Sequence, residues 1–235
     1  MDTREFFDAS YLKFGIAAQR RYPNEEFLRF MGRNFFGLEQ RQRSSVRVLE
    51  VGCGAGANLW VIAKEGFDAH GLDISIESLS LAKNLLGGHL VEAKLEVGDM
   101  TDLPYPDNYF DGIVDVFSSY CMNEDAGERF LWSVKRVLKP GGIFFSYFPS
   151  KTSDAFRDFQ PASFLDASTL DGIHRKTSPY SGNYYPFRFM STEQYRDDLV
   201  RVGLDVVYLE TTNRTYIDRT ERFEFISVEA IKAFQ

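Results

Sequence analysis

The 235-residue chain has 44% hydrophobic and 26% charged residues, which is typical of a folded globular protein. No apolar run approaches the ~20 residues that a membrane-spanning helix needs, and a formal charge of −7 argues against a nucleic-acid partner. Cys53 and Cys121 lie far apart and form no metal-spaced pair, and the opening MDTREFFDAS lacks the pattern of a signal peptide. We therefore expect a cytoplasmic protein with free thiols and no bound metal.

Residues 1–45 are expected to form a helical cap at the amino end of a single domain. The aromatic residues Phe27, Phe30, Phe35 and Phe36 are placed to pack this cap on a sheet. Basic residues in QRRYP and EQRQRSS are interpreted as solvated helix ends, since charge runs usually lie at the surface.

From residue 46 to 149 the sequence alternates between strand-like and helix-like segments. Such an alternation predicts parallel strands joined by crossover helices, hence an α/β layered sheet. Amphipathic periodicity predicts helices, and the short apolar segments between them predict strands. The expected strands cover residues 46–51, 67–73, 93–99, 110–117 and 142–148, and the expected helices cover 57–66, 75–86 and 125–139.

The rhythm breaks over residues 150–190, which are rich in Ser, Asp, Gly, Pro and Tyr and are expected to form an insertion that covers a pocket. A helix is expected over 191–203, because Ser191 and Gln194 form a capping-box pattern. Two closing strands, 204–210 and 222–233, follow. The linker between them is too short for a crossover helix, so they are expected to pair antiparallel.

The segment VLEVGCGAGANL, residues 48–59, places three alternate glycines between a strand and a helix. Glycines there let a ligand approach the backbone at a helix N-terminus. Gly52, Gly54 and Ala57 also satisfy a relaxed dinucleotide fingerprint, so a dinucleotide and S-adenosylmethionine both fit the loop. Asp73, at the end of the second strand, can accept ribose hydroxyls from either ligand.

The surroundings of the loop distinguish the two ligands. Glu50 opens an E-x-G-x-G-x-G pattern, GDMTDLPYPDNYFD follows the third strand, and VKRVLKPGG precedes the fifth. Together these motifs, over residues 46–148, resemble the class I S-adenosylmethionine-dependent methyltransferases, in particular the small-molecule group that includes the quinone-biosynthesis enzymes. The resemblance implies a Rossmann-like, seven-stranded, mostly parallel sheet with an antiparallel last strand and helices on both faces. It also implies S-adenosylmethionine as cofactor and methyl transfer to oxygen or nitrogen of a small molecule.

The resemblance also implies roles for individual residues. Glu50 would support the glycine loop, Asp73 would hold the ribose hydroxyls and Asp99 would bind the adenine edge. Asp115 would contact the methionine moiety through backbone groups, and Arg21 would approach the methionine carboxylate. The full set implied for the cofactor is Arg21, Glu50, Gly52, Gly54, Gly56, Asp73, Ile74, Asp99, Met100, Asp115 and Val116.

The reacting residues are less clearly marked. Many relatives have a histidine-rich stretch after the fourth strand, whereas this chain has FSSYCMNED, with Tyr120 and Cys121 at those positions. Tyr120 would either orient a substrate hydroxyl or serve as a packing aromatic. His174, in the insertion, is the candidate general base because imidazole titrates near neutrality, and a surface-loop histidine is the alternative.

Aromatic residues of the insertion and of the N-terminal cap are candidates for the substrate pocket, although they would also suit a hairpin packed on the sheet. The stretch 14–35 resembles one in bacterial methyltransferases that modify sugars and surface polysaccharides, which favours a sugar or related metabolite. Two other functions stay open: a dinucleotide-dependent oxidoreductase and a non-catalytic S-adenosylmethionine-binding partner protein. The candidate substrate residues are Tyr11, Tyr22, Tyr180, Tyr184, Tyr185 and Arg188.

Overall fold

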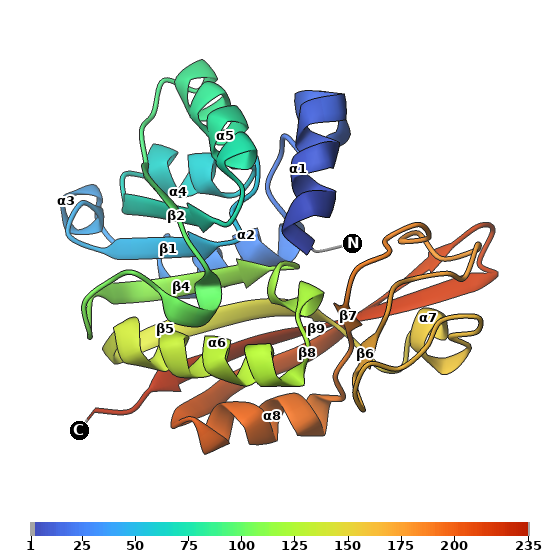
Figure 1. The fold of residues 1–235 in the computed structure, drawn as a ribbon. Coiled ribbons are helices and arrows are strands. Elements are labelled where there is room, and N and C mark those ends of the chain that lie inside the picture. Colours follow the sequence, from blue (N-terminus) through green and yellow to red (C-terminus); the bar gives the residue numbers. More distant parts are fainter. Residues whose placement is uncertain (1–2, 235) are drawn as a thin grey trace.

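The centre of the molecule is a twisted sheet, seen in a computed structural model that describes residues 3–234 (Figure 1). Over this range the sheet has seven strands in the order β3-β2-β1-β4-β5-β9-β8. Strands β1 to β5 run parallel, and β9 is antiparallel to both of its neighbours, β5 and β8. The expected Rossmann-like α/β fold is therefore confirmed. The strands are β1 Arg47–Val51, β2 Asp68–Asp73, β3 Lys94–Val97, β4 Phe110–Val116, β5 Leu138–Pro149, β8 Leu204–Tyr216 and β9 Glu221–Lys232.

Several of the helices begin at a polar residue whose side chain accepts hydrogen bonds from free backbone N–H groups. Ser75 accepts a hydrogen bond from the backbone of Ser78, and Ser191 accepts one from the backbone of Gln194. The helices are α1 Thr3–Phe14, α2 Glu25–Asn34, α3 Gln40–Arg43, α4 Leu59–Lys64, α5 Ile76–Gly88, α6 Glu124–Val137, α7 Asp154–Arg157 and α8 Thr192–Arg201, with 3₁₀ turns η1 Gly15–Ala18, η2 Met100–Asp102 and η3 Ser119–Cys121.

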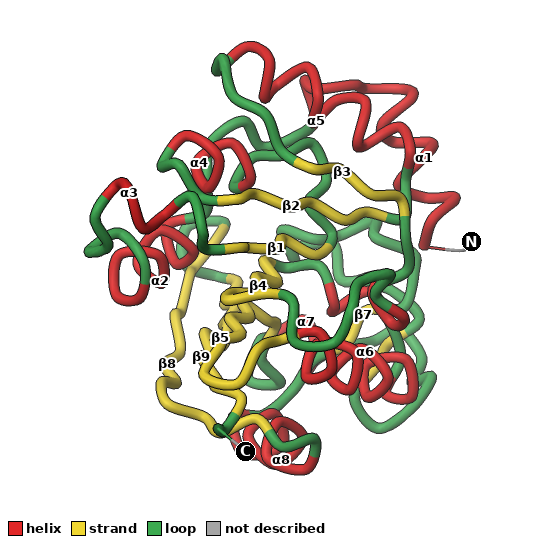
Figure 2. Tube along the Cα trace, turned by 90° about the vertical axis from the view of Figure 1, so that its left-hand side faces the viewer, coloured by secondary structure: helices red, strands yellow, loops and turns green. Residues whose placement is uncertain are grey.

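Helices α2 and α6 cover opposite faces of the sheet (Figure 2). Phe30 of α2 stacks on Phe145 of β5 with ring centroids 4.8 Å apart. Phe130 of α6 contacts Phe144, the residue before Phe145 in β5, with ring centroids 6.0 Å apart. Successive strand residues point to opposite faces, so these two contacts build a core layer on each side of β5. All four rings are almost entirely buried.

The closing hairpin is much longer than the sequence predicted. Most of the expected linker, 210–221, belongs to β8, which pairs with β9 from Leu204 opposite Lys232 to Tyr216 opposite Glu221. The turn itself is only residues 217–220. The second half of β8 is rich in polar residues, so its sequence did not indicate a strand. Polar residues are tolerated there because one side of the hairpin faces solvent, while Phe223 and Phe225 of β9 are buried on the other.

Residues 150–190 lie beside the far end of this hairpin (Figure 1). They contain α7 and two short paired strands, β6 Thr169–Leu170 and β7 Phe187–Arg188. Arg175 donates hydrogen bonds from Nε to both carboxylate oxygens of Glu221, at 2.9 and 3.1 Å. Glu221 is fully buried, so this ion pair connects the insertion to the start of β9.

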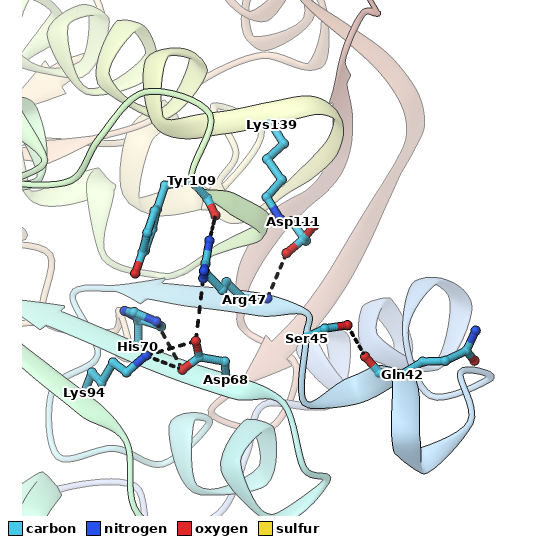
Figure 3. Close-up of polar contacts among 9 residues, drawn as sticks. All are labelled: Gln42, Ser45, Arg47, Asp68, His70, Lys94, Tyr109, Asp111 and Lys139. Carbon is cyan, nitrogen blue, oxygen red and sulfur yellow. Dashed lines mark hydrogen bonds and ion pairs between the residues drawn. The ribbon is translucent and has the colours of Figure 1, made fainter.

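Charged residues at the amino ends of the central strands pair with one another (Figure 3). Asp68 accepts a hydrogen bond of 2.8 Å from Lys94 and lies 3.7 Å from Nε of Arg47. Asp111 accepts from the Arg47 backbone N–H and from the Lys139 ammonium, at 2.8 and 2.7 Å. The opposite edge, where β1, β2 and β4 end, is the usual ligand edge of an open parallel sheet.

Candidate functional site

A cavity of about 450 Å³ opens at the carboxyl ends of β1, β2 and β4. It combines two regions. The cofactor region lies at the turn after β1, the end of β2 and the segments that cover them, and it includes Tyr11, Arg20, Glu50, Gly52, Gly54, Asp73, Ile74 and Met100. The acceptor compartment, formed by the turn after β4, β5, the insertion and the closing hairpin, consists of Phe117, Tyr147, Tyr180, Arg214, Tyr216 and Phe225.

The turn after β1 brings bare backbone to the cofactor region. Gly52 and Gly54 line the cavity with φ of +59° and +52°, a conformation that residues with a side chain rarely adopt. A Cβ atom at Gly52 would lie 1.6 Å from Oγ of Ser118, so only glycine fits. Gly56, also predicted as a cofactor contact, instead lies against Ala82 of α5 and does not line the cavity.

Asp73 ends β2 beside this turn and is 7% exposed. Its two carboxylate oxygens accept hydrogen bonds from the backbone N–H groups of Gly54, at 2.8 Å, and Ser75, at 2.9 Å. Burial raises the pKa of Asp73, and the two backbone donors oppose that rise. Each oxygen keeps a second lone pair, so the carboxylate can still accept hydroxyl groups from the cavity.

Glu50 connects the glycine turn to the N-terminal helices. Its Oε1 accepts a hydrogen bond of 2.6 Å from the Asn58 amide, whose oxygen accepts the backbone N–H of Asn24 at 2.8 Å. The other oxygen, Oε2, is buried and has no hydrogen-bond partner among the described residues. Burial raises the pKa of Glu50 to about 8. A cavity-lining carboxylate with an unused oxygen is suited to a ligand that donates a hydrogen bond.

The residues predicted around adenine and methionine divide into two groups. Ile74, Met100 and Val116 line the cavity. Asp99 does not line it, and its carboxylate accepts the backbone N–H of Thr101 at 2.8 Å, capping η2. Asp115 is fully buried behind the site, where it accepts hydrogen bonds from Ser146 Oγ and from the Ser119 backbone and hydroxyl, so its carboxylate organises the turn after β4.

Helix α1 covers the cofactor region. Tyr11 lines the cavity, and its hydroxyl lies 3.3 Å from the position a Cβ would take on Gly54. The Thr3 hydroxyl donates to the Cys121 carbonyl at 3.2 Å, and the Ser75 hydroxyl donates to Asp8. These bonds place the cap over the glycine turn.

The predicted arginine, Arg21, does not line the cavity, but its neighbour Arg20 does. Both arginines are exposed, and the Arg21 carbonyl accepts a hydrogen bond of 3.2 Å from Nε1 of Trp60. The chain after η1 is irregular, so no helical period indicated which of the two consecutive arginines faces inward.

Three aromatic contacts shape the acceptor compartment. Tyr147 stacks on Phe225 with ring centroids 4.6 Å apart, and Phe117 lies 4.9 Å from Tyr180. The hydroxyl of Tyr120, which also lines the cavity, lies 2.5 Å from that of Tyr185. Burial raises the pKa of Tyr120 well above its ordinary value, so this hydroxyl stays protonated near neutral pH.

Sequence reasoning missed Tyr147, Arg214 and Tyr216. Tyr147 lies near the carboxyl end of β5, opposite Val116 in the register, and the ligand-edge rule applied to β5 would have found it. Arg214 and Tyr216 lay inside the segment interpreted as a linker, where the sequence carried no signal for them.

Other predicted residues lie outside the cavity. His174 has its Nε2 3.5 Å from Asp171, and its ring packs 4.8 Å from that of Tyr184. Tyr22 and Tyr184 are 75% and 53% exposed. The insertion turns this part of its surface to solvent, so the sequence stretch that carries His174 and Tyr184 does not face the glycine turn.

Arg188 and Tyr185 point into the protein interior instead of the cavity. Arg188 is 4% exposed, donates to the Asn123 carbonyl at 3.3 Å and lies over the Phe148 ring. Tyr185 contacts two cavity-lining residues, Tyr120 through its hydroxyl and Phe7 through its ring, with centroids 5.3 Å apart. Tyr185 therefore supports the cavity wall from behind, whereas Arg188 is buried away from the cavity.

Within residues 3–234, no helix is both long enough and apolar enough to cross a membrane. Over the same residues, no group of three or more His, Cys, Asp or Glu side chains could hold a metal ion.

Comparison with known proteins agrees with this geometry. Residues 48–142 match the family described as a methyltransferase domain. The chain is 38% identical to the fatty-acid O-methyltransferase of Mycolicibacterium smegmatis over 103 residues, which cover 42% of this chain and 35% of that enzyme. It is also 31% identical to an uncharacterized protein of Methanocaldococcus jannaschii, over 92% of this chain and 81% of that protein.

A solved S-adenosylmethionine-dependent methyltransferase from Methanosarcina mazei shares the fold, with a TM-score of 0.65 and 19% identity over 80% of this chain and 93% of that one. The matched region of the chain spans about a third of the Mycolicibacterium enzyme. The glycine turn, the carboxylate at the end of β2 and the unused Glu50 oxygen suit S-adenosylmethionine, which carries ribose hydroxyls and an ammonium group. The chain belongs to the class I S-adenosylmethionine-dependent methyltransferases.

Proposed function

We propose that this protein transfers the methyl group of S-adenosylmethionine to an oxygen or nitrogen atom of a small molecule. The observation that carries the proposal is the continuity of one cavity, in which the glycine turn and Asp73 adjoin a compartment walled by tyrosine and phenylalanine. When bound, S-adenosylmethionine supplies an activated methyl group, and the protein has to align an acceptor with it.

Each residue of the cofactor region has a part in this proposal. Asp73 accepts the ribose hydroxyls, Glu50 accepts the methionine ammonium through Oε2, and Arg20 pairs with the methionine carboxylate. Met100 and Ile74 pack on adenine. The contact of Asp99 with the adenine amino group stays a prediction. Its carboxylate accepts the backbone N–H of Thr101 and does not line the cavity.

The acceptor is positioned rather than strongly activated. Tyr120 is a hydrogen-bonding group that orients the acceptor, because burial keeps its hydroxyl protonated. No histidine lines the described cavity. Aromatic walls with a few hydroxyls suit an aromatic compound or a sugar-like metabolite, and the net charge of −7 favours such a molecule over nucleic acid.

The test is incubation with methyl-labelled S-adenosylmethionine and a mixed pool of metabolites and nucleotide sugars, read by mass spectrometry. We expect a labelled product with the wild-type protein and none with a variant that has lost cofactor binding, such as Gly52→Ala. Absence of product from protein that binds S-adenosylhomocysteine would instead support the non-catalytic partner function.

A further inference from the structure

The acidic groups that line the cavity lie in one region, whereas basic groups lie in both. Among its described lining residues, the carboxylates are Glu50 and Asp73, both in the cofactor region. The cations are Arg20 and Arg214. Arg20 lies in the N-terminal cap between η1 and α2, whereas Arg214 belongs to β8 in the acceptor compartment, which has no carboxylate among its lining residues.

Arg214 has no hydrogen bond or ion pair to any described residue, although acidic residues lie nearby. Glu221 is held by Arg175, and Glu224 pairs with Arg222 at 3.1 Å and accepts from Asn213. On its outer side, Arg214 borders a surface depression together with Glu25, Glu26 and Glu210, but none of these three carboxylates forms an ion pair with it.

The hairpin aims Arg214 at the cavity. Arg214 pairs with Phe223 across the ladder, and Thr212 pairs with Phe225, which lines the cavity. Cross-strand partners share one face, so Arg214 stands on the cavity-facing side with Tyr216 two residues further along. Its guanidinium is a planar, permanently charged donor that matches the two oxygens of a carboxylate or phosphate.

The positive charge of Arg214 acts on side chains of the acceptor compartment. Burial raises the pKa values of Tyr147 and Tyr180, and in both cases the positive charge of Arg214 opposes that rise. Both tyrosines line the cavity. A local positive potential attracts anions even when the net charge of the protein is negative.

We propose that the acceptor carries a negatively charged oxygen group, a carboxylate or a phosphate, which Arg214 binds while its body lies between Tyr147, Tyr180 and Tyr216. This inference rests on the proposed function and specifies the class of its substrate. A carboxylate or phosphate that accepts hydrogen bonds from a guanidinium is a weaker nucleophile. That group therefore anchors the acceptor, and a separate oxygen or nitrogen atom receives the methyl group.

The experiment is calorimetric titration of the protein saturated with S-adenosylhomocysteine. The probes are 4-hydroxybenzoate, 4-hydroxyphenyl phosphate and the neutral 4-hydroxybenzamide, which compare a carboxylate, a phosphate and an uncharged amide on one 4-hydroxyphenyl ring. The variants are Arg214→Gln and Arg214→Lys, with Arg219→Gln as matched control, since Arg219 is an exposed arginine in the hairpin turn.

We expect at least one anionic probe to bind about tenfold tighter than the amide in the wild-type protein and in the Arg219 control. That preference should disappear in Arg214→Gln and partly return in Arg214→Lys, with the affinity for S-adenosylhomocysteine unchanged in all. Which anion binds tighter distinguishes a carboxylate from a phosphate anchor.

Equal binding of acid and amide, no binding of either anion at millimolar concentration, or a preference that survives in Arg214→Gln would each overturn the inference. The titration requires no methyl transfer, so its result is independent of the labelling experiment. An Arg214-dependent preference together with no labelled product would refute the proposed function and leave the anion site in place.

Discussion

The two halves of the cavity are built in different ways. The cofactor region comes mainly from turns at the ends of β1 and β2, where the backbone itself is the binding surface and Asp73 holds the turn in place. The acceptor compartment is assembled from side chains of the turn after β4, β5, the insertion and the closing hairpin. Backbone binding needs glycines in a fixed local pattern, whereas a wall of side chains needs only that distant strands meet. Substrate specificity can therefore change without altering the cofactor region.

The sharpest test of this division is Gly52→Ala. The added methyl group would overlap Ser118 and force a left-handed backbone on alanine. Affinity for S-adenosylhomocysteine should fall on the order of 100-fold in calorimetry. Gly87→Ala is the matched control, because Gly87 lies in α5 with open space at its Cβ position. Equal affinity in the two variants would contradict the assignment of the turn.

Removal of the carboxylate in Asp73→Ala should have the next largest effect. It deletes the acceptor for the ribose hydroxyls and also frees the backbone of Gly54 and Ser75. We expect about 2 kcal/mol less binding free energy for S-adenosylhomocysteine. Asp102→Ala, at an exposed aspartate of η2, should bind as the wild type does. An unchanged affinity in Asp73→Ala would remove this residue from the site.

The raised pKa of Glu50, in the cofactor region, predicts that the stability of the protein depends on pH. Burial raises its pKa to about 8 from 4.5, so between these values the folded protein keeps a proton that the unfolded chain releases. The free energy of unfolding should therefore fall as pH rises through this range. Glu50→Gln lacks this titration, so its stability relative to wild type should increase by about 1 kcal/mol for each pH unit between pH 5 and 8. Denaturant titrations of ligand-free protein measure this difference, and parallel pH profiles would exclude it.

The smallest effect is expected for His174→Ala. The imidazole lies outside the cavity beside Asp171 and Tyr184, so turnover of an acceptor found by labelling should stay within about twofold of wild type. Initial rates across pH 6 to 9 test this expectation. A loss of the alkaline or acidic limb of that profile in the variant would make His174 a proton-transfer group after all.

The sequence alone was sufficient to predict the α/β sheet and most of the cofactor region. Hydrophobic period, capping residues such as Ser75 and Ser191, and the glycine turn are local signals, and neighbouring residues along the chain remain neighbours at the end of a strand. The tertiary structure alone decided that Arg20 rather than Arg21 lines the cavity, that Arg188 is buried away from it, and that Arg214 and Tyr216 reach it. Those outcomes depend on the register of β8 with β9 and on the position of the insertion. Such long-range contacts leave no periodic trace in the segments that make them.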